Sequence, residues 1–368
     1  MFHKTQSEWK GAPLEMLYLG VDIHKKNCWV TVLNEDGREL EQRKLSMDRA
    51  VLLEYFGKIA KPARLAVEAT FNWYYFLDVI EPLGFELHLV HPQKTKAIAS
   101  AKIKHDKLDS RILAQLLRAG FIAEAWIAPP RVREQRQLLR HRTRTVRWAT
   151  RAKNGVHGVL NREGIVAPLD SLFGKQGRAF LGEVKLKELD RWEVDDQLVR
   201  LDLLQGQIDE LDREVLKRRK ADAVTQALDA IPGIGPFIAL LLVAEIGDVN
   251  RFPSAKHLVS YMGLAPSLYA SGERRWTGQI TKQGSSLLRW ALVQAAHRAA
   301  RSARFAPYYE RLAARHGAAK AAVGLARKLA TISYYRWRAV EARRSRAGGN
   351  KFGSAPRVAH GQNINPHV

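Results

Sequence analysis

The sequence predicts an α/β domain in its N-terminal third, a helical arm with a coiled-coil seam, and a mainly helical C-terminal domain. Short β-rich runs alternate with amphipathic stretches in residues 1–128. A basic segment and a heptad repeat occupy residues 129–222, and apolar helices punctuated by Pro and Gly fill residues 223–342. Residues 343–368 have little apolar content, so we expect a disordered tail there.

The first 128 residues predict three strands followed by helix and strand units. The three strands are expected at Leu17–Ile23, Cys28–Leu33 and Arg38–Leu45. A helix, a strand, a helix and a strand then follow at Asp48–Ile59, Ala63–Glu68, Trp73–Leu83 and Glu86–Val90. A further helix begins at Asp106, because apolar residues recur after it with helical period. This order of elements is typical of the ribonuclease H fold.

The charge of the chain favours a nucleic-acid partner. Its 60 Lys and Arg residues against 37 Asp and Glu residues leave a formal net charge of +23. There is no apolar run long enough to span a bilayer and no signal-peptide pattern, so we expect a cytoplasmic protein with no membrane partner. The single cysteine, Cys28, excludes an internal disulfide and a Cys-based zinc site, and its alternating apolar context predicts a core position.

Four carboxylates stand where they could hold divalent metal ions. Asp22 and Glu68 lie at the ends of apolar strands, and Asp106 and Asp109 are three residues apart on one helix face. Mg²⁺ (or Mn²⁺) takes hard oxygen ligands, and two such ions about 4 Å apart can assist phosphoryl transfer. Each acid alone is more simply a solvated surface residue. The apolar context of Asp22 and Glu68 favours the metal site, because burying an unpaired acid is costly. His24 and His105 neighbour these acids and are left unassigned.

A basic segment follows Pro129-Pro130. Residues 131–153 carry nine Arg or Lys residues and one Glu, which favours contact with a DNA or RNA backbone over a merely solvated face. The candidate contacts are Arg131, Arg133, Arg136, Arg140, Arg144 and Arg147. Further on, a heptad seam is formed by Leu201, Leu204, Ile208, Leu211 and Val215. Its partner is either the basic helix folded back antiparallel or the same helix of another subunit. The segment from Gly164 to Trp192 is expected to be a helical connection.

The C-terminal domain opens with a turn at residues 231–236, before an apolar helix predicted at Phe237–Glu245. Pro-Gly-x-Gly between two helices resembles a helix-hairpin-helix, whose backbone amides can receive a phosphate, although Gly and Pro also occur in ordinary turns. Residues 271–320 carry ten basic and two acidic residues, so this stretch too is expected to face nucleic acid.

Together these residues make the chain similar to transposases of the insertion sequence 110 family, over about residues 18–336. The N-terminal part of the resemblance is carried by Gly20-Val21-Asp22-Ile23-His24-Lys25, Glu68-Ala69-Thr70 and Lys104-His105-Asp106-Lys107-Leu108-Asp109-Ser110. The C-terminal part is carried by Pro232-Gly233-Ile234-Gly235, Tyr261-Met262-Gly263-Leu264-Ala265-Pro266, Ser271-Gly272, Thr281-Lys282-Gln283-Gly284 and Arg289.

The resemblance implies a RuvC-like domain that binds metal through the four acids, and a C-terminal transposase domain whose Ser271 forms a covalent phosphoserine link with DNA. It also implies homodimers that assemble into tetramers, and a noncoding bridge RNA that pairs with donor and target DNA. The acids and the serine would then meet in one active site, within a chain or between subunits. Arg274, Arg275, Lys282 and Arg289 are further candidate contacts to nucleic acid, and the first three could also activate Ser271 or stabilise phosphoryl charge. Ser285 and Ser286 are expected to cap a helix.

Two other functions are compatible with parts of the chain. A metal-dependent nuclease of the Holliday-junction type would use the acids and leave Ser271 unexplained. A non-enzymatic nucleic-acid scaffold would need only the positive charge, and four acids at the motif positions count against it.

Overall fold

The computed structural model describes residues 15–70, 72–92, 95, 106–168, 171–271 and 274–347, with the backbone alone at residues 106, 107, 268–271, 274, 275 and 277. The chain forms two compact units, Met1–Ile127 and Ala128–Val368. Among the described helices, none combines the length and the apolar character that crossing a membrane requires.

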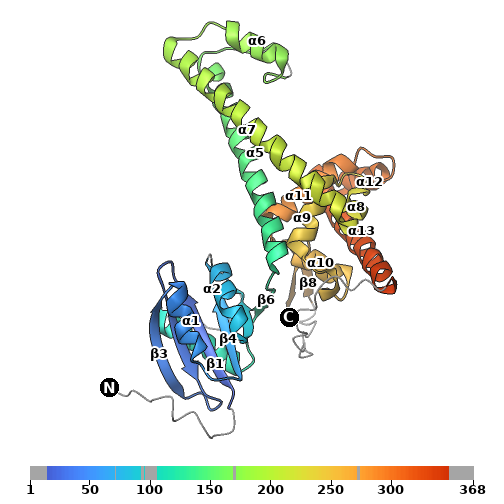
Figure 1. Ribbon diagram of the computed structural model, residues 1–368. Coiled ribbons are helices and arrows are strands. Elements are labelled where there is room, and N and C mark those ends of the chain that lie inside the picture. The colour runs from blue at the N-terminus through green and yellow to red at the C-terminus, as the bar shows by residue number, and fades with distance from the viewer. Residues whose placement is uncertain are drawn as a thin grey trace. The chain divides into compact units, whose positions relative to one another are not determined.

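The N-terminal unit contains a six-stranded sheet with the order β3-β2-β1-β4-β5-β6 (Figure 1). The strands are β1 Leu17–Ile23, β2 Asn27–Leu33, β3 Glu39–Ser46, β4 Ala63–Glu68, β5 Glu86–Val90 and β6 Glu124–Ala125. The helical elements are α1 Arg49–Gly57, α2 Trp73–Ile80, the 3₁₀ helix η2 Glu81–Leu83, and α4 Asp106–Arg118. The central strand β1 runs antiparallel to β2 and parallel to β4. The predicted mixed α/β architecture is therefore confirmed, and the short strand β6 is an addition to it.

One face of this sheet forms the main core of the unit. Leu19 and Val21 of β1 are fully buried, and they share a cluster with Phe56 of α1 and Phe76 of α2. The rings of Phe56 and Phe76 meet edge to face, with centroids 5.6 Å apart. Cys28 is also fully buried here, as its sequence context predicts.

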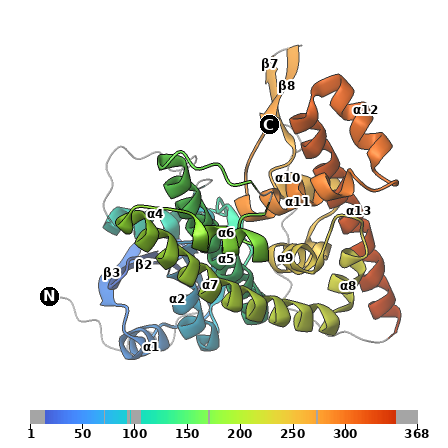
Figure 2. The same cartoon turned by 90° about the horizontal axis from the view of Figure 1, so that it is seen from above.

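In its described residues, the C-terminal unit is helical apart from one hairpin. Its helical elements are α5 Pro130–Arg162, α6 Lys175–Glu183, α7 Glu188–Ala221, α8 Ala223–Asp229, α9 Pro236–Ile246, the 3₁₀ helix η3 Val249–Arg251, α10 Ala255–Tyr261, α11 Ser286–Ala299, α12 Ala306–His316 and α13 Ala318–Arg346. The hairpin consists of β7 Pro266–Ser271 and β8 Arg274–Ile280, and it extends away from α10 and α11 (Figure 2).

The two long helices α5 and α7 pack side by side (Figure 1). Leu201 and Ile208 of α7 are buried against Ala149 and Ala152 of α5. Three ion pairs show that the two helices are antiparallel, because the residue number rises along α5 while it falls along α7. The pairs are Glu134–Arg218, Arg142–Asp212 and Arg162–Asp190. The apolar positions of the heptad seam therefore contact the basic helix of the same chain, which is one of the two partners that the sequence left open. Whether this packing is a true coiled coil stays a prediction.

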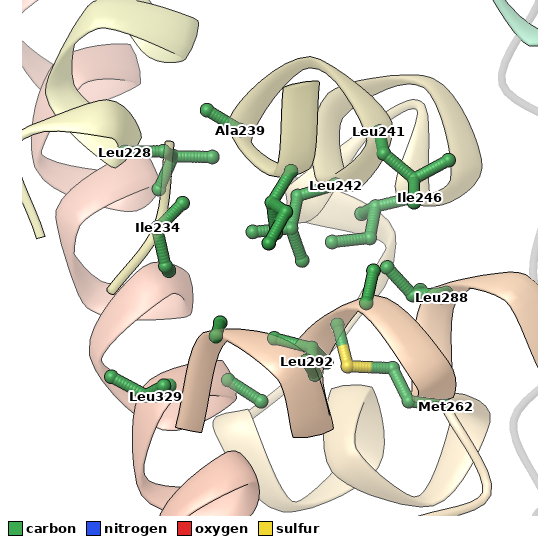
Figure 3. Packing of buried hydrophobic residues seen from close by; sticks show 14 of the residues in the cluster. Leu228, Ile234, Ala239, Leu241, Leu242, Ile246, Met262, Leu288, Leu292 and Leu329 are labelled. Atoms are coloured by element: carbon green, nitrogen blue, oxygen red, sulfur yellow. The ribbon is translucent and has the colours of Figure 1, made fainter. Parts of the chain in front are cut away.

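The core of the C-terminal unit surrounds α9 (Figure 3). Leu242 of α9 packs among side chains that include Leu228, Leu292 and Leu329. The predicted Pro-Gly-x-Gly turn does lie between two helices, α8 and α9. Its Gly233 has φ +90°, and a Cβ there would lie 2.4 Å from the carbonyl oxygen of Ala295. Gly233 is thus needed for close packing on α11.

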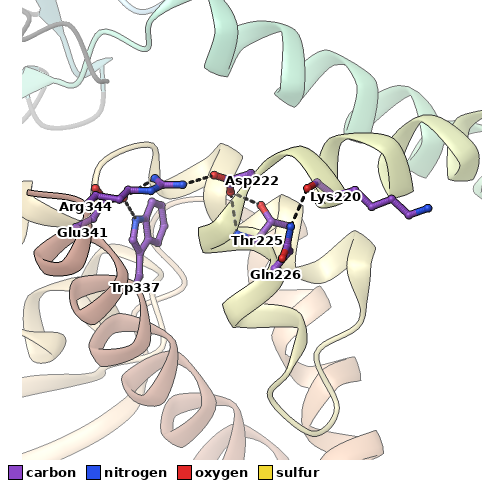
Figure 4. Close-up of polar contacts among 7 residues, drawn as sticks. All are labelled: Lys220, Asp222, Thr225, Gln226, Trp337, Glu341 and Arg344. Atoms are coloured by element: carbon purple, nitrogen blue, oxygen red, sulfur yellow. Dashed lines mark hydrogen bonds and ion pairs between the residues drawn. The ribbon is translucent and has the colours of Figure 1, made fainter. Parts of the chain in front are cut away.

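A polar network joins the start of α8 to the end of α13 (Figure 4). The Asp222 side chain accepts hydrogen bonds from the backbone N–H of Thr225 at 2.8 Å and from Arg344 at 3.1 Å. Burial by itself raises the pKa of Asp222, but these bonds from Thr225 and Arg344 outweigh it and lower the pKa. Arg344 also pairs with Glu341, and α13 extends to Arg346. Residues 343–346 are therefore helical, and the prediction that disorder begins at residue 343 is wrong for them. The rest of the predicted tail, from residue 348, lies outside the described residues.

Candidate active site

Two of the predicted metal ligands lie on the sheet face opposite the main core. Side chains alternate along a strand, so Gly20 and Asp22 share one face while Leu19 and Val21 point into the core. Val21 of β1 pairs with Val67 of β4, which places Asp22 and Glu68 at the next position of two neighbouring parallel strands. Both carboxylates therefore lie near the carboxyl ends of their strands, on the face of the sheet that α4 covers.

Helix α4 lies very close to this face because β1 has a glycine under it. A Cβ at Gly20 would be only 2.0 Å from the carbonyl oxygen of Ser110 and 2.4 Å from the backbone nitrogen of Ala114. The hydroxyls of Ser110 and Thr31, on β2, are 2.9 Å apart and form a buried hydrogen bond. Leu113 of α4 is buried in a cluster that also contains Ala66 of β4.

The direction of α4 places its first turn near the C-terminal end of β1, where Asp22 lies. At the other end of the helix, Gln115 and Arg118 donate hydrogen bonds to the carbonyls of Gly37 and Glu35, in the turn between β2 and β3. That turn adjoins the start of β1, so the N-terminal end of α4 lies toward Asp22. Asp106 is the first residue of α4 and Asp109 immediately precedes Ser110. The fold thus brings all four predicted positions to one region, although the side chain of Asp106 is outside the described set.

Asp22 is the most enclosed of the three acids whose side chains are described. It is 7% exposed, and its Oδ2 lies 3.0 Å from Nε2 of His24. Burial, together with the charge of Asp22, raises the pKa of the Cys28 thiol to about 12, so this thiol stays protonated and is a poor metal ligand. Glu68 and Asp109 are half-buried. His24, which the sequence left unassigned, is therefore a direct partner of Asp22, whereas His105 lies outside the described residues.

The donor chemistry of this region fits a hard divalent cation. Three described carboxylates come from a strand end, a neighbouring strand end and a covering helix, and carboxylate oxygens are the ligands that Mg²⁺ prefers. Within the described side chains, no three Asp, Glu, His or Cys groups gather closely enough to hold an ion by themselves. The predicted ligand set also includes Asp106, whose side chain lies outside the described set.

In the C-terminal unit, Ser271 is the last residue of strand β7 and pairs with Arg274, the first residue of β8. The two connecting residues, Gly272 and Glu273, lie outside the described residues. The serine is thus at the end of a β-hairpin, in a domain that the sequence predicted to be mainly helical. A two-residue loop that begins with Gly, between runs containing Tyr269 and Trp276, is the sequence signal that predicts such a hairpin.

The base of the hairpin is held by backbone contacts between two loops. Thr281 donates its backbone N–H to the carbonyl of Ala265 at 2.9 Å, and Lys282 donates to the carbonyl of Gly263 at 3.1 Å. Gly263 has φ +68°, and a Cβ there would lie 2.1 Å from the carbonyl oxygen of Gln283. Lys282 adopts φ +55°, an uncommon conformation for a residue with a side chain. This base is therefore a close-packed structure that tolerates few substitutions.

Arg289 fastens these loops to α11. Its Nη1 donates to the carbonyl oxygens of Gln283 at 2.6 Å and Gly284 at 3.1 Å, and partial burial lowers its pKa. These bonds give Arg289 a role in positioning the hairpin. Its contact with nucleic acid stays a prediction. Lys282 is exposed, and the side chains of Arg274 and Arg275 are outside the described set. Ser285 caps α11 by accepting from the N–H of Leu288, as predicted, and Ser286 is the first helical residue.

The six predicted arginines of α5 fall into two groups. Arg133 is buried, Arg136 donates to the carbonyls of Ala244 and Glu245 at 2.8 and 3.0 Å, and Arg140 pairs with the Glu245 carboxylate at 3.3 Å. Arg136 and Arg140 thus bind the C-terminal end of α9, where cations are favoured by the helix dipole. The other three, Arg131, Arg144 and Arg147, are exposed. Local sequence could not separate the groups, because it does not show which carbonyls are nearby.

Comparison with known proteins decides what kind of protein this region belongs to. A family model described as a transposase, of the DEDD type of the IS110 group, matches residues 19–164, which contain all four acids. A second model, described as the transposase IS116/IS110/IS902 family, matches residues 225–310, which contain Ser271. The chain belongs to the IS110/IS116/IS902 transposase family. It is accordingly a DNA-processing enzyme of an insertion sequence, and its DEDD domain suggests the use of a divalent metal.

Similar proteins extend this match over most of the chain. A transposase for insertion sequence element IS1328 from Yersinia enterocolitica is 27% identical over 332 residues, covering 86% of this chain and 95% of that protein. A probable family 20 transposase from Pseudomonas aeruginosa is 28% identical, covering 76% and 82%. A transposase for insertion sequence element IS1111A from Coxiella burnetii is 25% identical, covering 85% and 87%.

Proposed function

We propose that this transposase cleaves and rejoins donor and target DNA through a covalent link to Ser271, with Mg²⁺ (or Mn²⁺) held by Asp22, Glu68, Asp106 and Asp109. The main support is the shared sheet face of Asp22 and Glu68, over which α4 brings Asp106 and Asp109. A noncoding bridge RNA pairs with the donor and target DNA, and the protein acts as a homodimer that assembles into a tetramer.

In this proposal the Ser271 Oγ attacks a DNA phosphorus. The bond from Oγ to phosphorus forms, the bond from phosphorus to the leaving DNA oxygen breaks, and the serine proton is transferred away as the leaving oxygen gains one. Arg274, Arg275 and Lys282 stabilise the negative charge on the phosphoryl oxygens. Bound metal supplies Lewis-acid polarisation of the reacting phosphate. Rejoining is the same exchange in reverse, with a new DNA hydroxyl as the attacking group.

The charge of the chain supports partners beyond the DNA substrate. A net charge of +23 can neutralise more backbone than a single cleavage site presents. An RNA that pairs with DNA would also provide sequence recognition, while the protein contacts mainly phosphates.

The test is a denaturing gel of labelled element-end DNA incubated with Mg²⁺ and the RNA encoded beside the element. Wild type and Ser285→Ala should give a protein-linked DNA band, since Ser285 only caps α11. Ser271→Ala and Asp22→Asn should lower its yield by about 10³-fold or more, because each removes a group required for the chemical step. A protein-linked band from Ser271→Ala would refute the proposal. Free nicked DNA that requires Asp22 but not Ser271 would identify a metal-dependent junction nuclease instead.

A further inference from the structure

An exposed tryptophan lies within the basic face of α5. Trp148 is 45% exposed, although an indole ring usually gains from burial. Arg144 and Arg151 are four residues before and three residues after it, so these side chains share one helix face. Arg144, Arg147 and Arg151 are all exposed, and no carboxylate pairs with them among the described residues. The indole thus has exposed arginines at nearby positions of the same helix, and these are available to an outside partner.

Trp148 also lines a groove between α5 and α7. The groove is formed mainly by Trp148, Arg151, Gly155, Gln197, Arg200 and Leu203, and its volume is about 560 Å³, within the range of small-ligand pockets. A Cβ at Gly155 would lie 3.3 Å from the Gln197 side chain, so the helices approach closely at this glycine. The described lining contains no acid, although Arg200 is held by Asp196 at 2.9 Å. The groove therefore combines a flat aromatic wall with a positive rim.

A second exposed tryptophan on the same pair of helices has the opposite electrostatic surroundings. Trp192 of α7 is 72% exposed, and the residues four positions before and after it are Glu188 and Asp196. A polyanion would be repelled there and attracted at Trp148. Charge complementarity thus favours nucleic acid over protein at the Trp148 groove.

We propose that this groove binds a single strand of RNA, with one base stacked on Trp148 and the neighbouring phosphates on Arg144, Arg147 and Arg151. A duplex hides its bases in the stack, whereas an unpaired base can lie on an aromatic side chain. The inference rests on the proposed function in taking the strand to be RNA. The proposed function requires only that arginines contact phosphates. This inference adds a stacking site at Trp148 and an unpaired segment of the RNA.

The experiment measures binding of full-length protein to labelled oligouridine and to labelled duplex DNA by fluorescence anisotropy in EDTA. Trp148→Ala should weaken oligouridine binding about tenfold, the loss typical of one aromatic stack, and leave duplex binding unchanged. Trp148→Phe should keep most of the affinity, since its ring can still stack. Trp192→Ala is the matched control and should bind as wild type does. Thermal melting of each variant confirms that the fold is retained.

Three outcomes would overturn the inference. Unchanged oligouridine binding by Trp148→Ala would exclude the stack. An equal loss for duplex DNA would reduce the groove to a backbone contact. A lower molar mass of Trp148→Ala in sedimentation, with unchanged RNA affinity, would make this face a protein interface. Because EDTA prevents metal-assisted chemistry, these results do not depend on Ser271: oligouridine binding that requires Trp148 stands even if no covalent adduct ever forms.

Discussion

Asp22 and Ser271 lie in different structural surroundings, Asp22 in a six-stranded sheet and Ser271 in a two-stranded hairpin. Asp22 is the last residue but one of the central strand β1, which has a neighbouring strand on each side, a buried core on one face and α4 on the other. Ser271 ends a strand of a two-stranded sheet that has no further strand, and Trp276 on this hairpin is 54% exposed. Asp22 is thus held by two neighbouring strands, by the core and by α4, whereas Ser271 is held mainly through the base of its hairpin.

This difference indicates where each residue is vulnerable. A two-stranded hairpin is marginally stable by itself, so the position of Ser271 depends on the loops around Gly263 and Gly284 and on Arg289. The position of Asp22 depends on the packing of a whole domain. A substitution in the packing around Asp22 should therefore mainly lower the free energy of unfolding. A substitution at the base of the Ser271 hairpin should mainly lower the yield of protein-linked DNA, with a smaller effect on stability.

The largest stability effect is expected for Gly20→Ala. The added methyl group would meet backbone atoms of α4 at 2.0 and 2.4 Å, and backbone cannot move aside as a side chain can. The free energy of unfolding should fall by about 3 kcal/mol or more. Urea denaturation measures this, with Gly57→Ala as the control because a Cβ there meets nothing within 4 Å. Equal stability of the two variants would show that α4 does not lie on β1 as described.

An intermediate effect is expected for Arg289→Ala. Loss of its hydrogen bonds to loop carbonyls should lower the free energy of unfolding by about 1–2 kcal/mol. The yield of protein-linked DNA should fall much more than DNA affinity, since the variant misplaces Ser271 and leaves the basic surface in place. Arg298→Ala, on the exposed side of the same helix, is the control. If Arg289→Ala lost DNA affinity and kept its adduct yield per bound DNA, Arg289 would be a nucleic-acid contact as the sequence predicted.

The smallest effect is expected for the pH dependence of stability that the buried thiol of Cys28 causes. The pKa of Cys28 is raised to about 12 from an ordinary value of 9.0. A raised thiol pKa gives stability that is complete below pH 9 and is lost as pH rises toward 12, because the folded state disfavours the thiolate. At pH 10 the loss should be about 1 kcal/mol. The difference in melting temperature between wild type and Cys28→Ala should shrink from pH 8 to pH 10. Parallel curves would mean that this thiol ionises as easily when folded as when unfolded.

The sequence by itself determined the elements whose signals are local. Alternating apolar residues predicted the first strands, the recurring leucines after Asp106 predicted α4, and the charge predicted a nucleic-acid partner. The acids at strand ends could be selected because their apolar neighbours are adjacent in the chain. The predicted cap at Ser285 was confirmed for the same reason, since a cap needs only the next three residues.

Tertiary structure decided everything that depends on a distant partner. Arg136 and Arg144 look alike in the sequence, yet Arg136 binds the carbonyls of α9 and Arg144 is exposed, because a guanidinium is assigned by the groups around it and not by its neighbours in the chain. The heptad residues of α7 could pack on either of two helices until the fold placed α5 beside them. Gly20 carries no charge or apolar group that marks it, and only the approach of α4 shows why a side chain cannot stand there.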